Sequence, residues 1–398
     1  MKNTNLNFMQ GVNSLINDSE LKETNDKLSF IKNRIDEFFN IKNINFLLGS
    51  GTSCPAIPNM HGLFCKVKKE ISSKNEYMKS EFNSIVNRAK NNENLEDILG
   101  ILYSHKIYLE NHPCEIIKSN NCNSLIDFLE SIIFNNININ INNKTATPVL
   151  KTYKEFYQKI ALREKDLSRL NIFTTNNDLF NEYALDSLNI HYINGFGGGI
   201  ERFFNPALFN YSYSKRMDTS INKYEPVENL VYLYKIHGSV NWIEDNSNSN
   251  TFFKVKEVSN PKKEANNVLI YPTPTKQNKS LGSPYVEMFR EFQKKLLIPH
   301  SVLFVIGYSF SDEHVNNIIY QTLATNSSIN IVIMNDITGN NLCELNDNRI
   351  FRIWGYDDNK PIHYFNYIVQ NLLPNLDSNR KQHKIPDDVI EFYKNNLK

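Results

Sequence analysis

Asn45-Phe46-Leu47-Leu48-Gly49-Ser50-Gly51-Thr52-Ser53 is the segment around which the rest of this 398-residue chain is organised. Its apolar run ends abruptly in a Gly-x-Gly turn that carries hydroxyl groups. A buried strand of an α/β sheet opens onto a phosphate-binding loop in this way, because glycines permit a tight turn and let backbone N–H groups approach an anion closely. The third glycine of the dinucleotide-binding fingerprint is missing, so the turn alone is more often an ordinary strand end.

Length and composition bound the class of protein and its partners. The chain suits one large domain with insertions, or two domains. Lys and Arg number 44 against 43 Asp and Glu, and this balance predicts neither nucleic-acid nor membrane binding. Without a long apolar run or a signal peptide, we expect a soluble cytoplasmic protein. The five cysteines lack any Cys-x-x-Cys spacing, so we expect no disulfide framework and no metal.

Helical periodicity dominates the flanks and one long insertion. Residues 1–40 look helical, with an apolar stripe from Leu28 to Phe38, and are expected to form an N-terminal arm. Further stripes predict a helical insertion at about 63–163, whose last helix starts at Thr147-Pro148. A C-terminal helical tail is expected over 375–398.

Six further apolar runs predict the other strands of a sheet. Several are continuous rather than alternating, as is typical of strands that helices cover on both faces. Helical segments separate many of them, so residues 41–374 predict an α/β fold with a doubly wound, mostly parallel, Rossmann-like sheet. The runs are Leu170–Thr174, His191–Ile193, Leu230–Ile236, Val268–Tyr271, Val302–Ile306 and Ile329–Met334.

Small or polar residues follow six of the predicted strands. Ligands bind outside the carboxyl ends of the strands in such a sheet, so these residues are expected to line one crevice. A histidine or an Asn-Asp pair after one strand is usually structural, but six polar ends together are harder to explain in that way. They are Gly49-Ser50-Gly51, Thr175-Asn176-Asn177-Asp178, His237-Gly238-Ser239, Pro272-Thr273, Gly307-Tyr308-Ser309 and Asn335-Asp336.

These motifs resemble the sirtuin family, and they occur in the family's order between residues 46 and 336. Gly49–Ser53 resembles the Gly-Ala-Gly-x-Ser loop, Thr174–Asp178 resembles Thr-Gln-Asn-Ile-Asp, and Lys235–Ser239 resembles the strand end with the catalytic His-Gly. Gly307-Tyr308-Ser309 stands where the family has Gly-Thr-Ser. The four-cysteine zinc module of the deacylases is missing, since no cysteine lies between Cys122 and Cys343.

A closer resemblance is to the sirtuin-like subunits of bacterial antiphage systems that are encoded beside a HerA-type ATPase. Those subunits degrade NAD and so deplete the infected cell. The resemblance implies an NAD+ hydrolase, with NAD+ as substrate, that forms a large homo-oligomer and docks on a HerA-type ATPase, with 1–40 and 375–398 as candidate contacts. It is carried by Ile172–Asn176, Asn194–Phe196, Leu233–Ser239, Leu269–Pro272, Glu287–Arg290 and Gly307–His314.

The sirtuin resemblance also implies a role for each candidate site residue. Asn176 is expected to orient the nicotinamide ribose and the attacking water, and His237 is expected to act as the base. Asp312 either binds a ribose hydroxyl or caps the helix that begins there. The expected contacts to the rest of NAD+ are the phosphate-binding Gly49, Ser50, Gly51, Thr52, Ser53, Gly307 and Ser309, with Asp178 at the nicotinamide amide and Asn335 at the adenosine ribose.

Two other functions remain open from the sequence. An NAD-dependent deacylase is disfavoured by the missing zinc cysteines. A sensor that binds NAD or ADP-ribose without catalysis would keep the glycines and Ser309, but it has no need for both Asn176 and His237.

Overall fold

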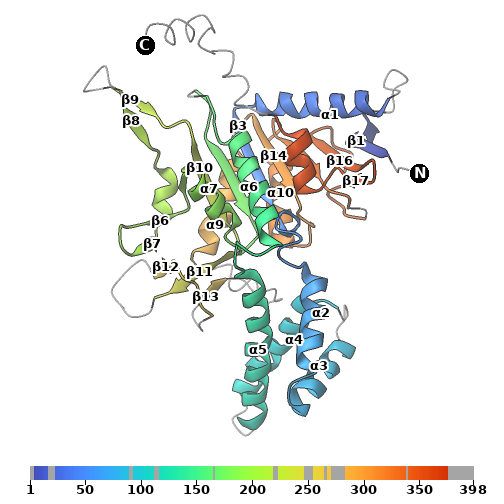
Figure 1. Cartoon of the computed structure of the whole chain (residues 1–398), viewed down its shortest axis with the longest axis vertical. Helices are drawn as coiled ribbons and strands as arrows, with labels where there is room; N and C mark the ends of the chain where they lie inside the picture. The colour runs from blue at the N-terminus through green and yellow to red at the C-terminus, as the bar shows by residue number, and fades with distance from the viewer. Residues whose placement is uncertain are drawn as a thin grey trace, which may run out of the picture.

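A ten-stranded, mostly parallel sheet forms the centre of the molecule (Figure 1). The computed structural model describes residues 4–16, 23–88, 93–111, 116–164, 166–217, 223–245, 254–263, 267–269, 283–337 and 339–374. The strands of the sheet are β1 (Asn5–Gln10), β2 (Asn13–Ser14), β3 (Asn43–Leu48), β4 (Leu170–Thr174), β5 (His191–Ile193), β10 (Leu230–Lys235), β14 (Ser301–Ile306), β15 (Asn330–Met334), β16 (Ile350–Asp357) and β17 (Lys360–Pro361). The order is β2-β1-β16-β15-β14-β3-β4-β10-β5, and all neighbours from β16 to β5 are parallel.

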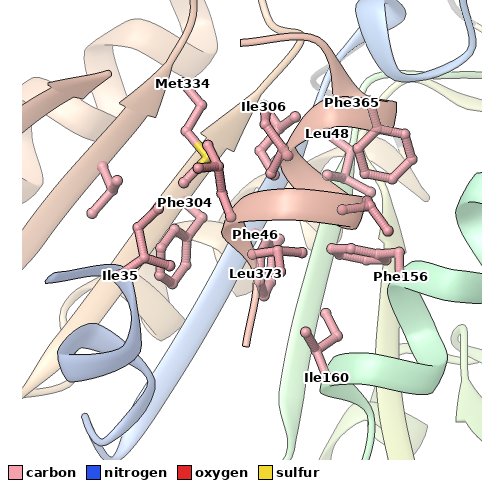
Figure 2. Close-up of a cluster of buried hydrophobic side chains, with 14 of the residues drawn as sticks. Ile35, Phe46, Leu48, Phe156, Ile160, Phe304, Ile306, Met334, Phe365 and Leu373 are labelled. Carbon is pink, nitrogen blue, oxygen red and sulfur yellow. The ribbon is translucent and has the colours of Figure 1, made fainter. Parts of the chain in front are cut away.

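Helices cover both faces of this sheet because successive side chains of a strand point to opposite sides. Phe46 and Leu48 of β3 belong to one apolar cluster, shown in Figure 2, whereas Leu47 belongs to the cluster on the other face. The first face is covered by α1 (Thr24–Phe39), α6 (Ala146–Ile160), α7 (Phe180–Ser187), α11 (Phe365–Tyr367) and the turn η4 (Ile368–Leu372), and the second by α9 (Tyr285–Leu296) and α10 (Glu313–Thr325). The predicted doubly wound α/β fold is therefore confirmed.

The strand order reverses beside β3. From β3 the chain proceeds to β4 on one side and later enters β14 on the other, with Leu48 opposite both Thr174 and Ile306. The turns that follow β3 and β14 therefore leave the sheet next to each other. In doubly wound folds the crevice at such a reversal is the usual place for a ligand.

A helical subdomain projects from the end of the molecule at which these turns lie (Figure 1). It contains α2 (Met60–Ile71), α3 (Glu76–Arg88), α4 (Leu95–Glu110) and α5 (Ile116–Ile137), which enclose an apolar core of their own. The helix expected as the last part of this insertion is α6, and it packs on the central sheet instead, where Phe156 contacts the ring of Phe46. Among the described residues, no helix is both long and apolar enough to cross a membrane.

A second, antiparallel sheet lies beside the carboxyl end of β10. It has the order β13-β11-β12-β7-β6 and is formed by β6 (Phe196–Gly197), β7 (Arg202–Phe204), β11 (Gly238–Glu244), β12 (Val255–Glu257) and β13 (Asn267–Leu269), while β8 (Ser214–Arg216) and β9 (Tyr224–Pro226) form a separate hairpin. The prediction that the run at Val268 belongs to the parallel sheet is wrong, because β13 pairs antiparallel with β11. A short apolar run does not reveal which sheet it joins. Pro272-Thr273, expected to follow that run, lies outside the described residues.

The expectation of a helical arm over residues 1–40 is wrong for its first part. Strand β1 pairs antiparallel with β16, from Asn5 opposite Tyr356 to Gln10 opposite Phe351, and Phe8 is fully buried. Helix α1 follows and buries Ile31 and Ile35 against the same core. The segment is thus part of the central fold. Its strand was missed because β16, the partner that stabilises it, lies far away in the sequence. The predicted tail over 375–398 falls outside the described residues.

Candidate active site

Five polar strand ends lie in a row at the carboxyl edge of the sheet. Strands β10, β4, β3, β14 and β15 are consecutive neighbours, so the residues that follow them come together as expected. The sixth predicted end, Pro272-Thr273, lies outside the described residues. The row consists of His237, Thr175–Asp178, Gly49–Ser53, Gly307–Ser309 and Asn335.

Two glycine turns contact each other in the middle of the row. The amide of Gly51 donates to the carbonyl of Gly307 at 2.9 Å, and Gly307 has a φ of +64°. A Cβ atom on Gly49 would lie 2.5 Å from the oxygen of Gly307, and one on Gly51 would lie 2.8 Å from its Cα. These glycines are therefore required for the close approach of one backbone turn to another.

Most amides of the first turn are already paired within the protein. The amides of Gly49, Gly51, Thr52 and Ser53 donate to the carbonyls of Ile306, Gly307, Gly49 and Ser50, at 2.9 to 3.1 Å. Ser50 and Gly51 form the exposed part of the turn, whereas Thr52 and Ser53 are buried. In this conformation the turn presents the Ser50 side chain to solvent rather than a ring of unpaired amides.

Asn176 is held against this turn. Its Nδ2 atom lies 3.1 Å from the Gly49 carbonyl, 3.1 Å from Thr52 Oγ1 and 3.0 Å from Ser53 Oγ, and the residue is buried. The phenol of Tyr153, on α6, contacts Thr52 Oγ1 at 2.7 Å. A residue predicted to touch the substrate thus also fixes the geometry of the neighbouring turn.

Asp178 is a buried carboxylate that links the same turn to helix α7. Its Oδ2 accepts a hydrogen bond from Ser53 Oγ at 2.7 Å, and its Oδ1 accepts one from the Phe180 amide at 3.1 Å. Burial raises the pKa of this carboxyl, while the charge of Lys235 and these hydrogen bonds act in the opposite direction. Asp178, like Asn176, therefore joins the loop after β4 to the turn after β3.

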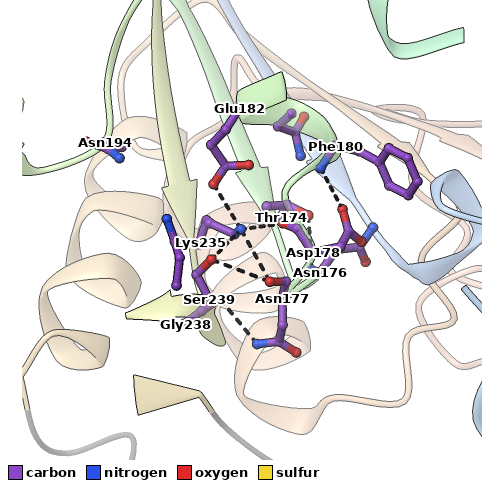
Figure 3. A network of polar contacts seen from close by, with 12 residues as sticks. Thr174, Asn176, Asn177, Asp178, Phe180, Glu182, Asn194, Lys235, Gly238 and Ser239 are labelled. Carbon is purple, nitrogen blue, oxygen red and sulfur yellow. Dashed lines mark hydrogen bonds and ion pairs between the residues drawn. The ribbon is translucent and has the colours of Figure 1, made fainter. Parts of the chain in front are cut away.

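The side chain of Lys235 lies against the loop after β4, as Figure 3 shows. Its side chain is 1% exposed, and its Nζ atom donates to Glu182 Oε1 at 2.9 Å, to Ser239 Oγ at 2.7 Å and to the carbonyl of Asp178. Burial raises the pKa of Glu182, and the Lys235 charge opposes this rise. No role for Lys235 was predicted from the sequence. The available signal was a lysine at the end of the otherwise apolar strand β10. A charge buried in this way requires polar partners, so the lysine could have been predicted to hold neighbouring residues in place.

His237 lies next to Asp312, a residue at the end of the loop between β14 and α10. Its Nε2 atom is 2.8 Å from Asp312 Oδ2, and the two side chains are only 12% and 7% exposed. The backbone of His237 is fixed as well, because Asn177 Nδ2 donates to its carbonyl at 2.7 Å. The structure therefore brings together two residues that sequence reasoning had not connected.

The remaining predicted contacts lie on the more open side of the row. Ser309 is exposed, with its Oγ 2.9 Å from Ser311 Oγ. Asn335 is half-buried, and its Nδ2 donates to the carbonyl of Tyr308 at 2.7 Å. Within the described ranges, no three His, Cys, Asp or Glu side chains are grouped closely enough to hold a metal ion.

Comparison with known proteins gives a match for the central part of the chain. Residues 170–340 match the family model of the SIR2-like domain. No curated protein matches the chain. A solved Sir2 homologue with a serine-to-alanine substitution, in complex with ADP-ribose, aligns with 89% of this chain and 99% of its own, at 10% identity and a TM-score of 0.38. The match to the SIR2-like domain model runs from β4 to beyond β15. It supports the interpretation of this chain as a sirtuin-like protein and implies an NAD-binding function.

Proposed function

We propose that this protein hydrolyses NAD+ to nicotinamide and ADP-ribose. The observation that supports this most directly is the row of five polar strand ends at the reversal of strand order, which holds a buried amide, a buried carboxylate and an imidazole beside two glycine turns. The crevice at such a reversal binds dinucleotides in doubly wound folds. All of these groups except the first glycine turn fall within the SIR2-like match.

Hydrolysis of NAD+ requires that the substrate and the attacking water are held in position and that one base accepts a proton. It does not require a strong acid. When the bond between nicotinamide and ribose breaks, nicotinamide leaves with the bonding electrons and positive charge develops on the ribose. His237 takes a proton from the water that adds to the ribose carbon, and Asn176 orients the ribose and that water. Asp178 holds the amide of the nicotinamide.

The rest of the dinucleotide extends across the two glycine turns. Ser50 and Ser309 are the exposed hydroxyl residues of these turns, and we assign them the first contacts with the pyrophosphate. Gly49, Gly51 and Gly307 supply the close backbone packing on which both hydroxyls depend. Asn335, at the end of β15, contacts the adenosine ribose.

Purified protein incubated with NAD+ should release nicotinamide and ADP-ribose in equal amounts without any acylated peptide. Activity should survive treatment with a chelator, because the proposed mechanism uses no metal. Chromatographic separation of the products measures both. Release only in the presence of an acyl-lysine peptide would identify a deacylase instead. Tight ADP-ribose binding without nicotinamide release would identify a sensor, and either result would overturn the proposal.

We further propose that the activity serves antiphage defence by depleting NAD+, in a homo-oligomer docked on a HerA-type ATPase. The support for this assembly is the motif resemblance alone. Light scattering should give several times the mass of one chain at micromolar concentration, and a further increase when the ATPase encoded beside it is added. A monomer that ignores the ATPase would contradict the assembly without affecting the NAD+ chemistry.

A further inference from the structure

The carboxylate of Asp312 is not used in the way that its position at a helix start suggests. Asp312 occupies the N-cap position of α10, yet its side chain makes no capping hydrogen bond. Capping is the usual function of an aspartate there. The side chain instead lies at ion-pair distance from His237, at 2.8 Å between Oδ2 and Nε2. Something other than helix stability therefore accounts for its orientation.

The loop that carries Asp312 is held in one conformation. Gly307 and Phe310 both have positive φ angles, +64° and +57°, and a bulky residue adopts such an angle only where its surroundings enforce it. Phe310 is 3% exposed and packs on the ring of Tyr308. The Tyr308 hydroxyl donates to the Asp312 carbonyl at 3.3 Å, and Asn316 Nδ2 donates to the Phe310 carbonyl at 2.7 Å. Asp312 is thus placed in advance.

We propose that Asp312 is a positioning residue that acts through His237. A carboxylate beside Nε2 keeps the proton of the neutral imidazole on that nitrogen and leaves the lone pair on Nδ1. The same carboxylate stabilises the imidazolium that forms when His237 accepts a proton. Nδ1 is then the basic atom of the site. The effect on rate rests on the proposed hydrolase function, whereas the effect on the tautomer does not.

The competing assignment is a direct contact between Asp312 and a ribose hydroxyl, as the sirtuin resemblance implies. The two assignments predict different losses. A ribose contact made equally in ground and transition state affects mainly ligand affinity, whereas a positioning role affects mainly turnover. Glu313 provides a matched control, since it is an exposed carboxylate in the first turn of the same helix.

The first test is nitrogen NMR on protein labelled only at its histidines, with the His237 signals identified by their loss in His237→Gln. The resting wild-type protein should show His237 protonated at Nε2. Asp312→Asn should change the His237 nitrogen shifts towards a mixture of tautomers, while Glu313→Gln leaves them unchanged. Identical His237 shifts in wild type and Asp312→Asn would overturn the proposal, whether or not the protein cleaves NAD+.

The second test compares turnover with ligand affinity. In Asp312→Asn, kcat should fall by about 10²-fold, the lower end of the range for impaired general-base catalysis. The Kd of ADP-ribose, measured by calorimetry, should stay within about threefold, and Glu313→Gln should match the wild type in both. A large loss of ADP-ribose affinity with kcat retained would assign Asp312 to the ribose and overturn the positioning role. Failure of the wild type to release nicotinamide would refute the hydrolase function, and the NMR result alone would then decide the positioning role.

Discussion

Nicotinamide release should fall by about 10²–10⁴-fold in His237→Ala, the loss expected when a general base is removed. Asn176→Ala should lose at least as much, because its amide also holds three acceptors of the Gly49–Ser53 turn. Steady-state release of nicotinamide from NAD+ measures both losses. Circular dichroism should show that the secondary structure of each variant is retained.

Suitable controls separate chemistry from folding in this experiment. His314→Ala removes an imidazole from α10, where its ring lies 6.3 Å from that of Phe289, and it should turn over at nearly the wild-type rate. Asn176→Asp keeps the shape of the side chain but replaces its only donor by an acceptor. It should therefore be as inactive as Asn176→Ala. Near-normal turnover in His237→Ala would refute the proposed mechanism.

The central sheet was predictable because its strands are encoded locally. Each of β3, β4, β10, β14 and β15 is a predominantly apolar run followed by small or polar residues, and this pattern is visible without knowing any partner. The row of strand ends followed from it, since the ligand side of such a sheet is fixed by topology. The parts that failed depend on distant pairing. Strand β1 is stabilised by β16, and β13 by β11.

The candidate site was only partly predictable for a related reason. Sequence motifs identified Asn176 and His237 as single residues, but the contact between His237 and Asp312 joins the end of β10 to the start of α10. No spacing rule connects positions so far apart. The glycines show the same limit, because Gly49 and Gly51 were interpreted as an anion loop and the structure shows them packed against the turn at Gly307.

Lys235→Met should destabilise the protein by about 3–5 kcal/mol, the usual cost of removing one partner from a buried ion pair. The side chains of Lys235 and Glu182 are 1% and 8% exposed, so Glu182 would be left with a buried, uncompensated charge. The Asp178 carbonyl and Ser239 Oγ would lose the same donor. Urea unfolding followed by circular dichroism, with the slope compared between variants, measures the change.

Two further variants make this result specific to the buried pair. Lys294→Met removes a lysine that is 53% exposed and pairs with Glu291 at 3.0 Å on the surface of α9, and its effect should stay below about 1 kcal/mol. Lys235→Met combined with Glu182→Met replaces both charges by apolar groups, and it should recover part of the stability lost in Lys235→Met alone because no unpaired charge remains. If Lys235→Met costs no more than Lys294→Met, Lys235 is not a support of the loop after β4. A double variant less stable than Lys235→Met would show that the backbone carbonyls, rather than Glu182, are its important partners.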